Sequence, residues 1–376
     1  MIELDLILKP ISPLLIGGGM DVRNVRRSRP FIPGSVLRGS LAIEMIRASE
    51  DMPSLKEVFE ELFLGDRPAM FDPLYPTYEP SDEVIPAPVT AITCKDYGPE
   101  HLLADTLIPR VKSDKPSRWI CPKCDGGRLE RWRGFISRGK RMGCVSLSDV
   151  PRKMHVKVGL NRYTETAEEG ILYALEAIEP KLIFQGKLRI DEEMWGKLEE
   201  FLKMRFKRVD GGYRIRVGGG RARGFGLAIL SIRQSSHVSV EERVERFQEM
   251  ISDPKHIYFT LTAISPVLIL NRTGESEMNL PAEMIAGWVE PIPEGTMVEA
   301  EELTGWSEAW GMPKPILQAI GAGSVFTFRA PASKREELIP ILRRIHMEGI
   351  GERRSEGLGR VSICDPFHLE RINANM

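Results

Sequence analysis

The sequence predicts an α+β protein built from two tandem copies of one module, because two patterns occur once in each half of the chain. The first is a loop rich in glycine and arginine, in which Gly218, Arg221, Gly224 and Gly226 recur at the same spacing as Gly351, Arg354, Gly357 and Gly359. The second is an apolar strand carrying Ile-Ser-Pro, at 11–13 and again at 264–266. Internal repeats define the architecture of a chain before any single motif does. We therefore expect a first module over 1–233, a linker helix over 234–255 and a second module over 256–376.

Composition limits the class of protein. The 376 residues are long for one domain and sufficient for two. The formal net charge is −1, which excludes nucleic-acid binding through bulk charge but leaves local basic patches possible. No stretch reaches the roughly 18 apolar residues of a membrane span, and no signal-peptide pattern precedes the first strand. Five cysteines fit a metal site in a reducing compartment, so we expect a cytoplasmic protein.

The first module begins with an alternating strand over 2–9. A run of arginines follows, and it is either a solvated loop or a surface for a polyanion: Arg23, Arg26, Arg27 and Arg29. Pro33-Gly34-Ser35 then predicts a helix start with Ser35 as its N-cap and Arg38 one turn inside. Such a helix end can bind phosphate through its free N–H groups. The helix should reach about residue 48, and another should cover 54–64.

These motifs resemble a known family. Ile-Pro-Gly-Ser-x-Leu-Arg-Gly at 32–39 together with Gly-x-Arg-x-x-Gly-x-Gly at 219–226 is similar to the RAMP superfamily of CRISPR-associated RNA-binding proteins. The resemblance implies ferredoxin-like, RRM-type βαββαβ modules. Two fused modules, the second containing 306–315 and 322–326, resemble the subunit that holds the 5′ end of the guide RNA (crRNA) in type III effectors. The type III-D version is the most similar.

A proline-rich insertion over about 65–150 is expected to carry a zinc knuckle. Residues 65–120 have no clear periodicity, and Cys121-x-x-Cys124 supplies half of a tetrahedral site. Cys94, His101, Cys144 and His155 are candidates for the other half, and we expect Cys94 and Cys144 to complete a structural zinc site. A knuckle remnant without metal is the alternative. Basic residues around the knuckle, with Trp119 and Trp132 among them, suit either an RNA strand or the packing of a small lobe.

The remaining RNA contacts are expected near the first glycine loop. A helix over 191–203, capped by Asp191, leads into a basic segment that contains Arg214 and Arg216. The loop itself adds backbone N–H groups and arginine forks suited to phosphate. Its predicted contacts are Gly218, Gly219, Gly220, Arg221, Arg223 and Gly224, with Arg353 and Arg354 in the second copy. The family resemblance adds Asn161 and Arg162, on a projecting hairpin. Glycine-rich segments are also common as plain turns, and the recurring arginines favour a binding role.

We predict a non-catalytic subunit that binds the 5′ tag of the crRNA, in antiviral defence. Its expected protein partners are a large polymerase- or cyclase-like subunit and the backbone RAMP subunits, with target RNA contacted indirectly. The second module replaces the Gly-Ser and Arg38 of the first with Ala282-Glu283 and Ala286, so a structural role and a helix over 333–346 are expected there. No convergent pair of general acid and base is visible. An endoribonuclease that processes precursor crRNA and an assembly subunit without RNA contact remain alternatives.

Overall fold

The computed structural model describes residues 1–17, 25–112, 120–124, 127–138, 143–161, 163–235, 239–307 and 311–370. Arg23 and Arg162, two of the predicted RNA contacts, lie outside these ranges. Over the described residues, none of the helices is both long enough and apolar enough to span a membrane.

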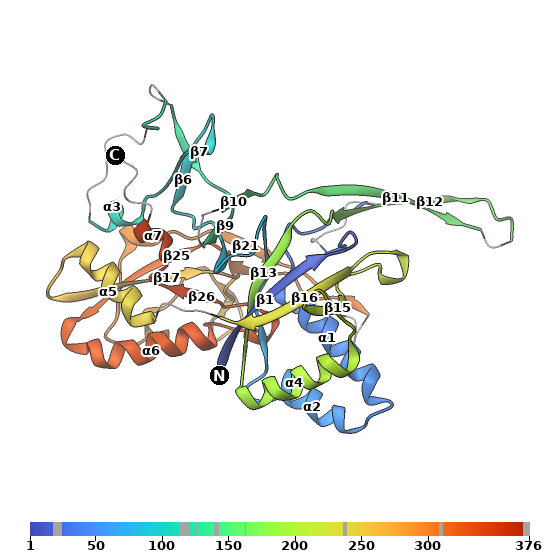
Figure 1. Ribbon diagram of the computed structural model, residues 1–376. Coiled ribbons are helices and arrows are strands. Elements are labelled where there is room, and N and C mark those ends of the chain that lie inside the picture. The colour runs from blue at the N-terminus through green and yellow to red at the C-terminus, as the bar shows by residue number, and fades with distance from the viewer. Residues whose placement is uncertain are drawn as a thin grey trace.

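The first half of the chain forms an antiparallel sheet around its first strand (Figure 1). The strand order is β14-β15-β16-β1-β13-β3, and β4 also pairs with β13. The strands are β1 (Ile2–Pro10), β3 (Met70–Phe71), β4 (Tyr75–Thr77), β13 (Ile183–Ile190), β14 (Arg208–Val209), β15 (Gly212–Arg216) and β16 (Leu227–Gln234). Alternate residues of β1, namely Leu4, Leu6 and Leu8, enter the main apolar core. The predicted strand over 2–9 is confirmed.

Three helices lie below this sheet in Figure 1: α1 (Gly34–Ser49), α2 (Ser54–Phe63) and α4 (Glu192–Arg205). Their predicted positions are confirmed to within two residues. Asp191 caps α4 as expected, because its carboxylate accepts a hydrogen bond from the Glu193 N–H. The predicted cap of α1 is wrong, since the helix begins at Gly34 and Ser35 lies inside its first turn. Glycine is required at 34 because a Cβ there would lie 1.8 Å from the Phe71 carbonyl oxygen.

The insertion is folded, which corrects the prediction of an irregular segment over 65–120. It contains one sheet of order β10-β9-β5 and another of order β7-β6-β8. The elements are β5 (Glu83–Pro86), β6 (Ala91–Cys94), β7 (Gly98–Asp105), α3 (Leu107–Val111), β8 (Leu129–Arg131), β9 (Gly134–Arg138) and β10 (Gly143–Ser146). The prolines hid the strand pattern in the sequence. In the structure, the prolines within strands lie in short edge strands or at strand ends, where no hydrogen bond of the ladder is lost.

The second half forms a sheet of order β20-β25-β17-β26. Its strands are β17 (His256–Ala263), β20 (Glu290–Pro291), β25 (Val325–Pro331) and β26 (Val361–Ile363). In both halves the first strand is central. It lies between β13 and the last strand β16 in the first half, and between β25 and the last strand β26 in the second. Helix α6 (Arg335–Glu348) precedes β26, confirming the predicted helix there. At the position of α1, however, the second half has only a single turn, η2 (Ala282–Met284).

Along the chain, α5 (Val240–Ile251) follows the last strand of the first sheet and precedes the first strand of the second. A helix therefore does occur in the predicted linker. Ser239 caps it by accepting a hydrogen bond from the Glu242 N–H. Val240, Val244 and Phe247 enter the apolar core of the second half. The helix is therefore packed against the second sheet instead of lying free between two modules.

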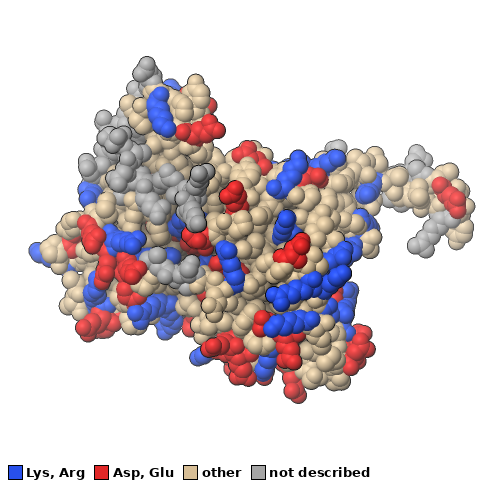
Figure 2. Space-filling model, in the orientation of Figure 1, with Lys and Arg blue, Asp and Glu red and all other residues tan. Residues whose placement is uncertain are grey.

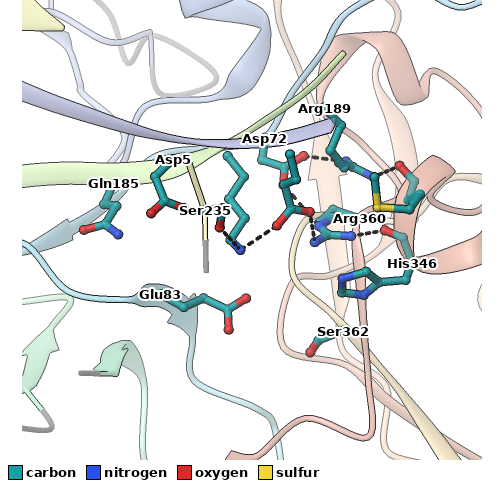
Figure 3. A network of polar contacts seen from close by, with 12 residues as sticks. Asp5, Asp72, Glu83, Gln185, Arg189, Ser235, His346, Arg360 and Ser362 are labelled. Carbon is teal, nitrogen blue, oxygen red and sulfur yellow. Dashed lines mark hydrogen bonds and ion pairs between the residues drawn. The ribbon is translucent and has the colours of Figure 1, made fainter. Parts of the chain in front are cut away.

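Charged side chains, almost fully buried, join the two halves (Figure 3). Arg360 of the second half contacts Glu3 at 3.0 Å and Asp72 at 3.1 Å, both in the first half. Arg189 contacts Asp72 at 2.5 Å and donates to the Met347 carbonyl at 2.6 Å. Burial alone would raise the pKa of Glu3, but Arg360 and Lys187 outweigh it and hold that pKa well below its usual range. The paired charges fix one arrangement of the halves.

The two Ile-Ser-Pro segments have the same structural role, which is to close the glycine loop of their own half. We call residues 217–226 the first loop and 350–359 the second loop. The hydroxyl of Ser12 accepts a hydrogen bond from the Leu227 N–H, and that of Ser265 accepts one from Arg360, both at 2.9 Å. Two backbone hydrogen bonds also recur. The Pro13 carbonyl accepts from the Gly226 N–H as the Pro266 carbonyl does from the Gly359 N–H, and the Leu15 carbonyl accepts from the Gly219 N–H as the Leu268 carbonyl does from the Glu352 N–H.

Each half also has a hairpin beside its loop. The first arm, β11 (Arg152–Leu160) with β12 (Ala167–Ile178), projects far from the body (Figure 1). The second arm is shorter and pairs β21 (Ala300–Leu303) with β24 (Leu317–Ile320), then β22 (Trp306–Ser307) with β23 (Met312–Pro313). Each arm begins at a matching backbone bridge, Leu14 with Ile178 and Val267 with Ile320. The repeat thus extends beyond the two motifs visible in the sequence.

Candidate nucleic-acid interface and metal centre

The base of the first arm and the first loop form one junction of cationic and aromatic side chains. Arg223 donates a hydrogen bond to the Tyr173 hydroxyl at 3.0 Å, and its guanidinium lies 5.7 Å from the centre of that ring. The Lys157 ammonium lies 6.0 Å from the centre of the Phe225 ring, and the His155 ring meets Phe225 edge-on at 5.2 Å. Lys157 and Tyr173 are opposite each other across the arm. Phosphate binding and base stacking need this combination of groups.

Other predicted arginines border the junction. The short strand β2 (Val25–Arg26) pairs with β12 and brings Arg26 opposite Leu175. Arg27, Arg214 and Arg216 are exposed, and Arg216 also donates to the Arg221 carbonyl at 2.7 Å. Figure 2 shows lysine and arginine side chains gathered below the arm, over the region that Figure 1 labels β15 and β16. The predicted basic surface therefore exists around the first loop.

Three predicted arginines have partners within the protein. Arg221 donates to the Ser40 hydroxyl at 2.8 Å and to the Gly218 carbonyl at 3.1 Å, which ties the first loop to α1. Arg38 donates to the Phe63 carbonyl at 2.5 Å, and burial lowers its pKa. Arg29 contacts Glu301 at 3.5 Å on the second arm. These side chains hold elements together, so less of their donor capacity faces solvent.

The second loop is also engaged internally. Arg353 donates two hydrogen bonds to Glu356, which Lys314 of the second arm contacts at 2.6 Å. Burial raises the pKa of Glu356, but these two cations outweigh it and lower the pKa to about 2. Arg354 lies 3.9 Å from Glu348. A Cβ at Gly357 would lie 2.5 Å from the Phe71 carbonyl oxygen, so this loop abuts the start of α1. The predicted arginines of the second loop are thus paired within the protein.

Sequence reasoning missed the arm's contribution to the junction. His155, Lys157, Tyr173 and Phe225 were not singled out as binding residues. Alternation in β11 was the available signal, since His155 and Lys157 face the loop while Val156 and Val158 face solvent. Asn161 lies at the arm's far end, where its side chain accepts hydrogen bonds from the N–H groups of Tyr163 and Thr164. It stabilises the turn.

A second site, in the insertion, brings together four potential metal ligands. The donor atoms of Cys94, His101, Cys121 and Cys124 all lie within 4.8 Å of one another. The Cys94 and Cys124 sulfurs are 3.6 Å apart, close to the roughly 3.8 Å expected between ligands of a tetrahedral ion with bonds of about 2.3 Å. Desolvation and the two neighbouring thiols raise the pKa of Cys124 to about 12, and a bound cation would favour its thiolate form. Three sulfurs and one imidazole fit a structural zinc ion.

The predicted ligand set is wrong in one position. Cys144 lies on β10, in the other small sheet, and packs against the main apolar core. His101 takes its place: its Nδ1 lies 3.1 Å from the Cys124 sulfur, and the exposed Tyr97 stacks on its ring. Spacing along the chain could not distinguish these candidates, because strand pairing between β6, β7 and β8 assembles the site. His155, another candidate, is on the first arm.

The described histidines outside the metal cluster are dispersed over the structure. His346 is half-buried near the end of α6, and the fully buried His368 is held by Asp105 at 2.9 Å and Thr262 at 2.8 Å. His256 contacts Asp253 beside the start of β17. His155 is the described histidine at the junction, where Glu179 lies 3.5 Å away.

The chain is similar to known proteins at the level of family and of overall structure. Two structures of the type III-B Cmr-beta complex bound to cognate target RNA, one also with AMPPnP, each contain a similar chain. The first is 15% identical with a TM-score of 0.46 and covers 89% of this chain and 88% of that one. The second is 14% identical with a TM-score of 0.46 and covers 86% of each.

A chain in the apo state of Cmr-beta is 12% identical, has a TM-score of 0.35 and covers 61% of this chain and 97% of that one. No curated protein sequence matches this chain. The family model of the RAMP superfamily matches residues 7–229, more than half of the chain and nearly all of the first sheet with its loop and arm. The chain therefore belongs to the RAMP superfamily.

Proposed function

We propose that the chain is a non-catalytic RNA-binding subunit of a type III CRISPR effector complex, which holds the 5′ tag of the crRNA. The junction between the first arm and the first loop carries this proposal. Arg223 and Lys157 supply positive charge there, and Tyr173 supplies a ring against which a base can stack. Arg26 and Arg27 extend the cationic surface in the direction that a bound RNA strand would follow. Positioning through phosphate and stacking contacts requires no chemistry from the protein.

The finer features of the assignment fit this function. The strand orders of the two sheets support two tandem ferredoxin-like modules with boundaries near 233 and 256. A zinc ion at Cys94, His101, Cys121 and Cys124 would stabilise the insertion. We assign the second module to assembly with a large subunit and backbone RAMP subunits, and the complex to subtype III-D. The second loop supports that division, since its Arg353 is already paired with Glu356.

RNA binding at graded salt tests the proposal. Arg223→Ala with Lys157→Ala should weaken binding of a crRNA and reduce the salt slope by about one for each cation removed from a phosphate. Tyr173→Ala should cost about 1–3 kcal/mol because a base can no longer stack there. The control is Arg343→Ala, an exposed arginine on α6 that pairs with Glu241. Unchanged RNA affinity in all junction variants would refute this site and leave the assembly role without RNA contact.

A second function has a specific observation in its favour. His155, Lys157 and Tyr173 converge on the junction, and these residue types can supply the proton transfers of metal-independent RNA cleavage. Incubating the full chain with precursor crRNA in a chelator tests this. Defined cleavage by the natural chain that His155→Ala abolishes, while RNA affinity is kept, would make the chain an endoribonuclease. Intact RNA after prolonged incubation would support the binding role.

A further inference from the structure

The second module has an open pocket where the first module has a helix. The pocket measures about 270 Å³ and is lined by Met284, Arg344, Ile345, Glu348, Gly349, Ile350, Gly351 and Arg354. Its walls come from η2, the last turns of α6 and the second loop. In the first module the corresponding elements are α1, the end of α4 and the first loop.

The contacts of α1 show what those walls hold in the first module. Arg221 of the first loop donates to the Ser40 hydroxyl, and Arg205 at the end of α4 contacts Glu44 at 2.8 Å. Leu37, Leu41 and Met45 of α1 are buried in the core. A helix of 16 residues therefore occupies this position, with two hydrogen-bond acceptors four residues apart.

The pocket of the second module keeps the walls but lacks the helix. Arg354 stands at the loop position of Arg221, lies 3.9 Å from the Glu348 carboxylate and donates a hydrogen bond to the Glu348 carbonyl at 3.4 Å. Among the described residues, Arg344 has no ion pair. Met284 is 42% exposed, although its counterpart by sequence, Val36, packs against the core of the first module. Two arginines and the exposed Met284 thus border a pocket whose floor is the nearly buried Ile345 and Ile350.

We propose that this pocket is the docking site for an α-helix of a protein partner, seated as α1 is seated in the first module. The helix would place an apolar side chain against Met284, the exposed apolar residue of the pocket lining. It would carry two acceptors four residues apart, at least one of them acidic, toward Arg354 and Arg344. This inference deepens the assembly part of the proposed function and rests on it. The seat of α1 in the first module favours a helix over RNA as the occupant, and RNA is an outcome that the test below distinguishes.

Photocrosslinking in the assembled complex tests the proposal. The full chain, with a benzophenone side chain at Met284, is co-produced with the other subunits of its complex and irradiated. The control carries the same group at Met52, another exposed methionine, beyond the far end of α1. We expect crosslinks from Met284 to one helical segment of one protein subunit that contains the two spaced acceptors.

Charge removal supplies the second measurement. Arg344→Ala with Arg354→Ala should reduce that crosslink and the co-purified subunit at least about tenfold, with RNA content unchanged. The matched control, Arg335→Ala with Arg343→Ala, removes arginines of α6 that face α5.

Several results would overturn the docking site: crosslinks to RNA or to residues 371–376 of this chain, crosslinking no stronger than from Met52, or equal loss in both double variants. Absence of RNA from the unmodified complex would refute the proposed function instead, so the two failures are distinguishable.

Discussion

Gly224 and Gly357 stand at the same position of the repeat, and alanine at each should have very different consequences. Both glycines have a positive φ, 88° and 87°. Alanine in that conformation costs roughly 1–2 kcal/mol at either site. A Cβ at Gly224 would have no atom within 4 Å, whereas one at Gly357 would lie 2.5 Å from the Phe71 carbonyl oxygen and 3.1 Å from the Gly34 Cα.

Those neighbours are backbone atoms of the first half and cannot rotate away. Overpacking of this kind costs about 1–3 kcal/mol, so Gly357→Ala should lower the free energy of unfolding by about 2–5 kcal/mol and Gly224→Ala by about 1–2. Urea unfolding followed by tryptophan fluorescence measures both variants under the same conditions. Equal midpoints for the two variants would refute the reasoning, because they would mean that the second loop does not press against α1.

Four further outcomes are expected. Gly226→Ala and Gly359→Ala should destabilise to a similar degree, since each Cβ would lie within 2.3 Å of a carbonyl oxygen; urea midpoints that differ widely would contradict the equivalence of the loops. Arg360→Met should cost up to about 3–5 kcal/mol, because Glu3 and Asp72 each lose one of two buried cations and keep only Lys187 and Arg189 of the pairs described above, which thermal unfolding would reveal. His101→Ala should lower the zinc content measured by atomic absorption, whereas Cys144→Ala should not; the reverse result would restore the original ligand set. The pKa values of Glu3 and Glu356 are lowered in the folded chain, so both carboxylates stabilise the folded state. This stabilisation is complete above the ordinary carboxyl pKa of about 4.5 and is lost as the pH falls below it. Unfolding measurements from pH 6 to pH 3 would follow the loss.

Periodicity and start signals were enough to locate the longer helices. The helices at 34–49, 54–63, 192–205 and 335–348 each have an apolar period or a start signal that does not depend on the rest of the chain. The repeat was visible because close backbone contacts restrict Gly226 and Gly359 to glycine in both halves. Local rules failed in the insertion, where prolines mask short strands whose pairing is decided by partners far along the chain.

The candidate site was harder to predict for the same reason. Arg223 was identified from its loop, but Tyr173 becomes its partner only because the arm folds over that loop. Likewise, Arg353 was predicted to contact RNA. Only the structure shows that the Glu356 carboxylate accepts hydrogen bonds from its guanidinium. A charged residue seen in the sequence does not reveal whether its counter-charge lies within the protein.

The central position of β1 has a consequence for synthesis of the chain on the ribosome. Its neighbour β16 is completed only at Gln234, and the second cation that pairs with Glu3, after Lys187, arrives only with Arg360. At roughly 5–20 residues per second, the first sheet closes on the order of ten seconds before that arginine emerges. Until then one of the two cations that neutralise Glu3 is absent, so the side of the nascent first half that Arg360 later covers should stay accessible to solvent or to a chaperone.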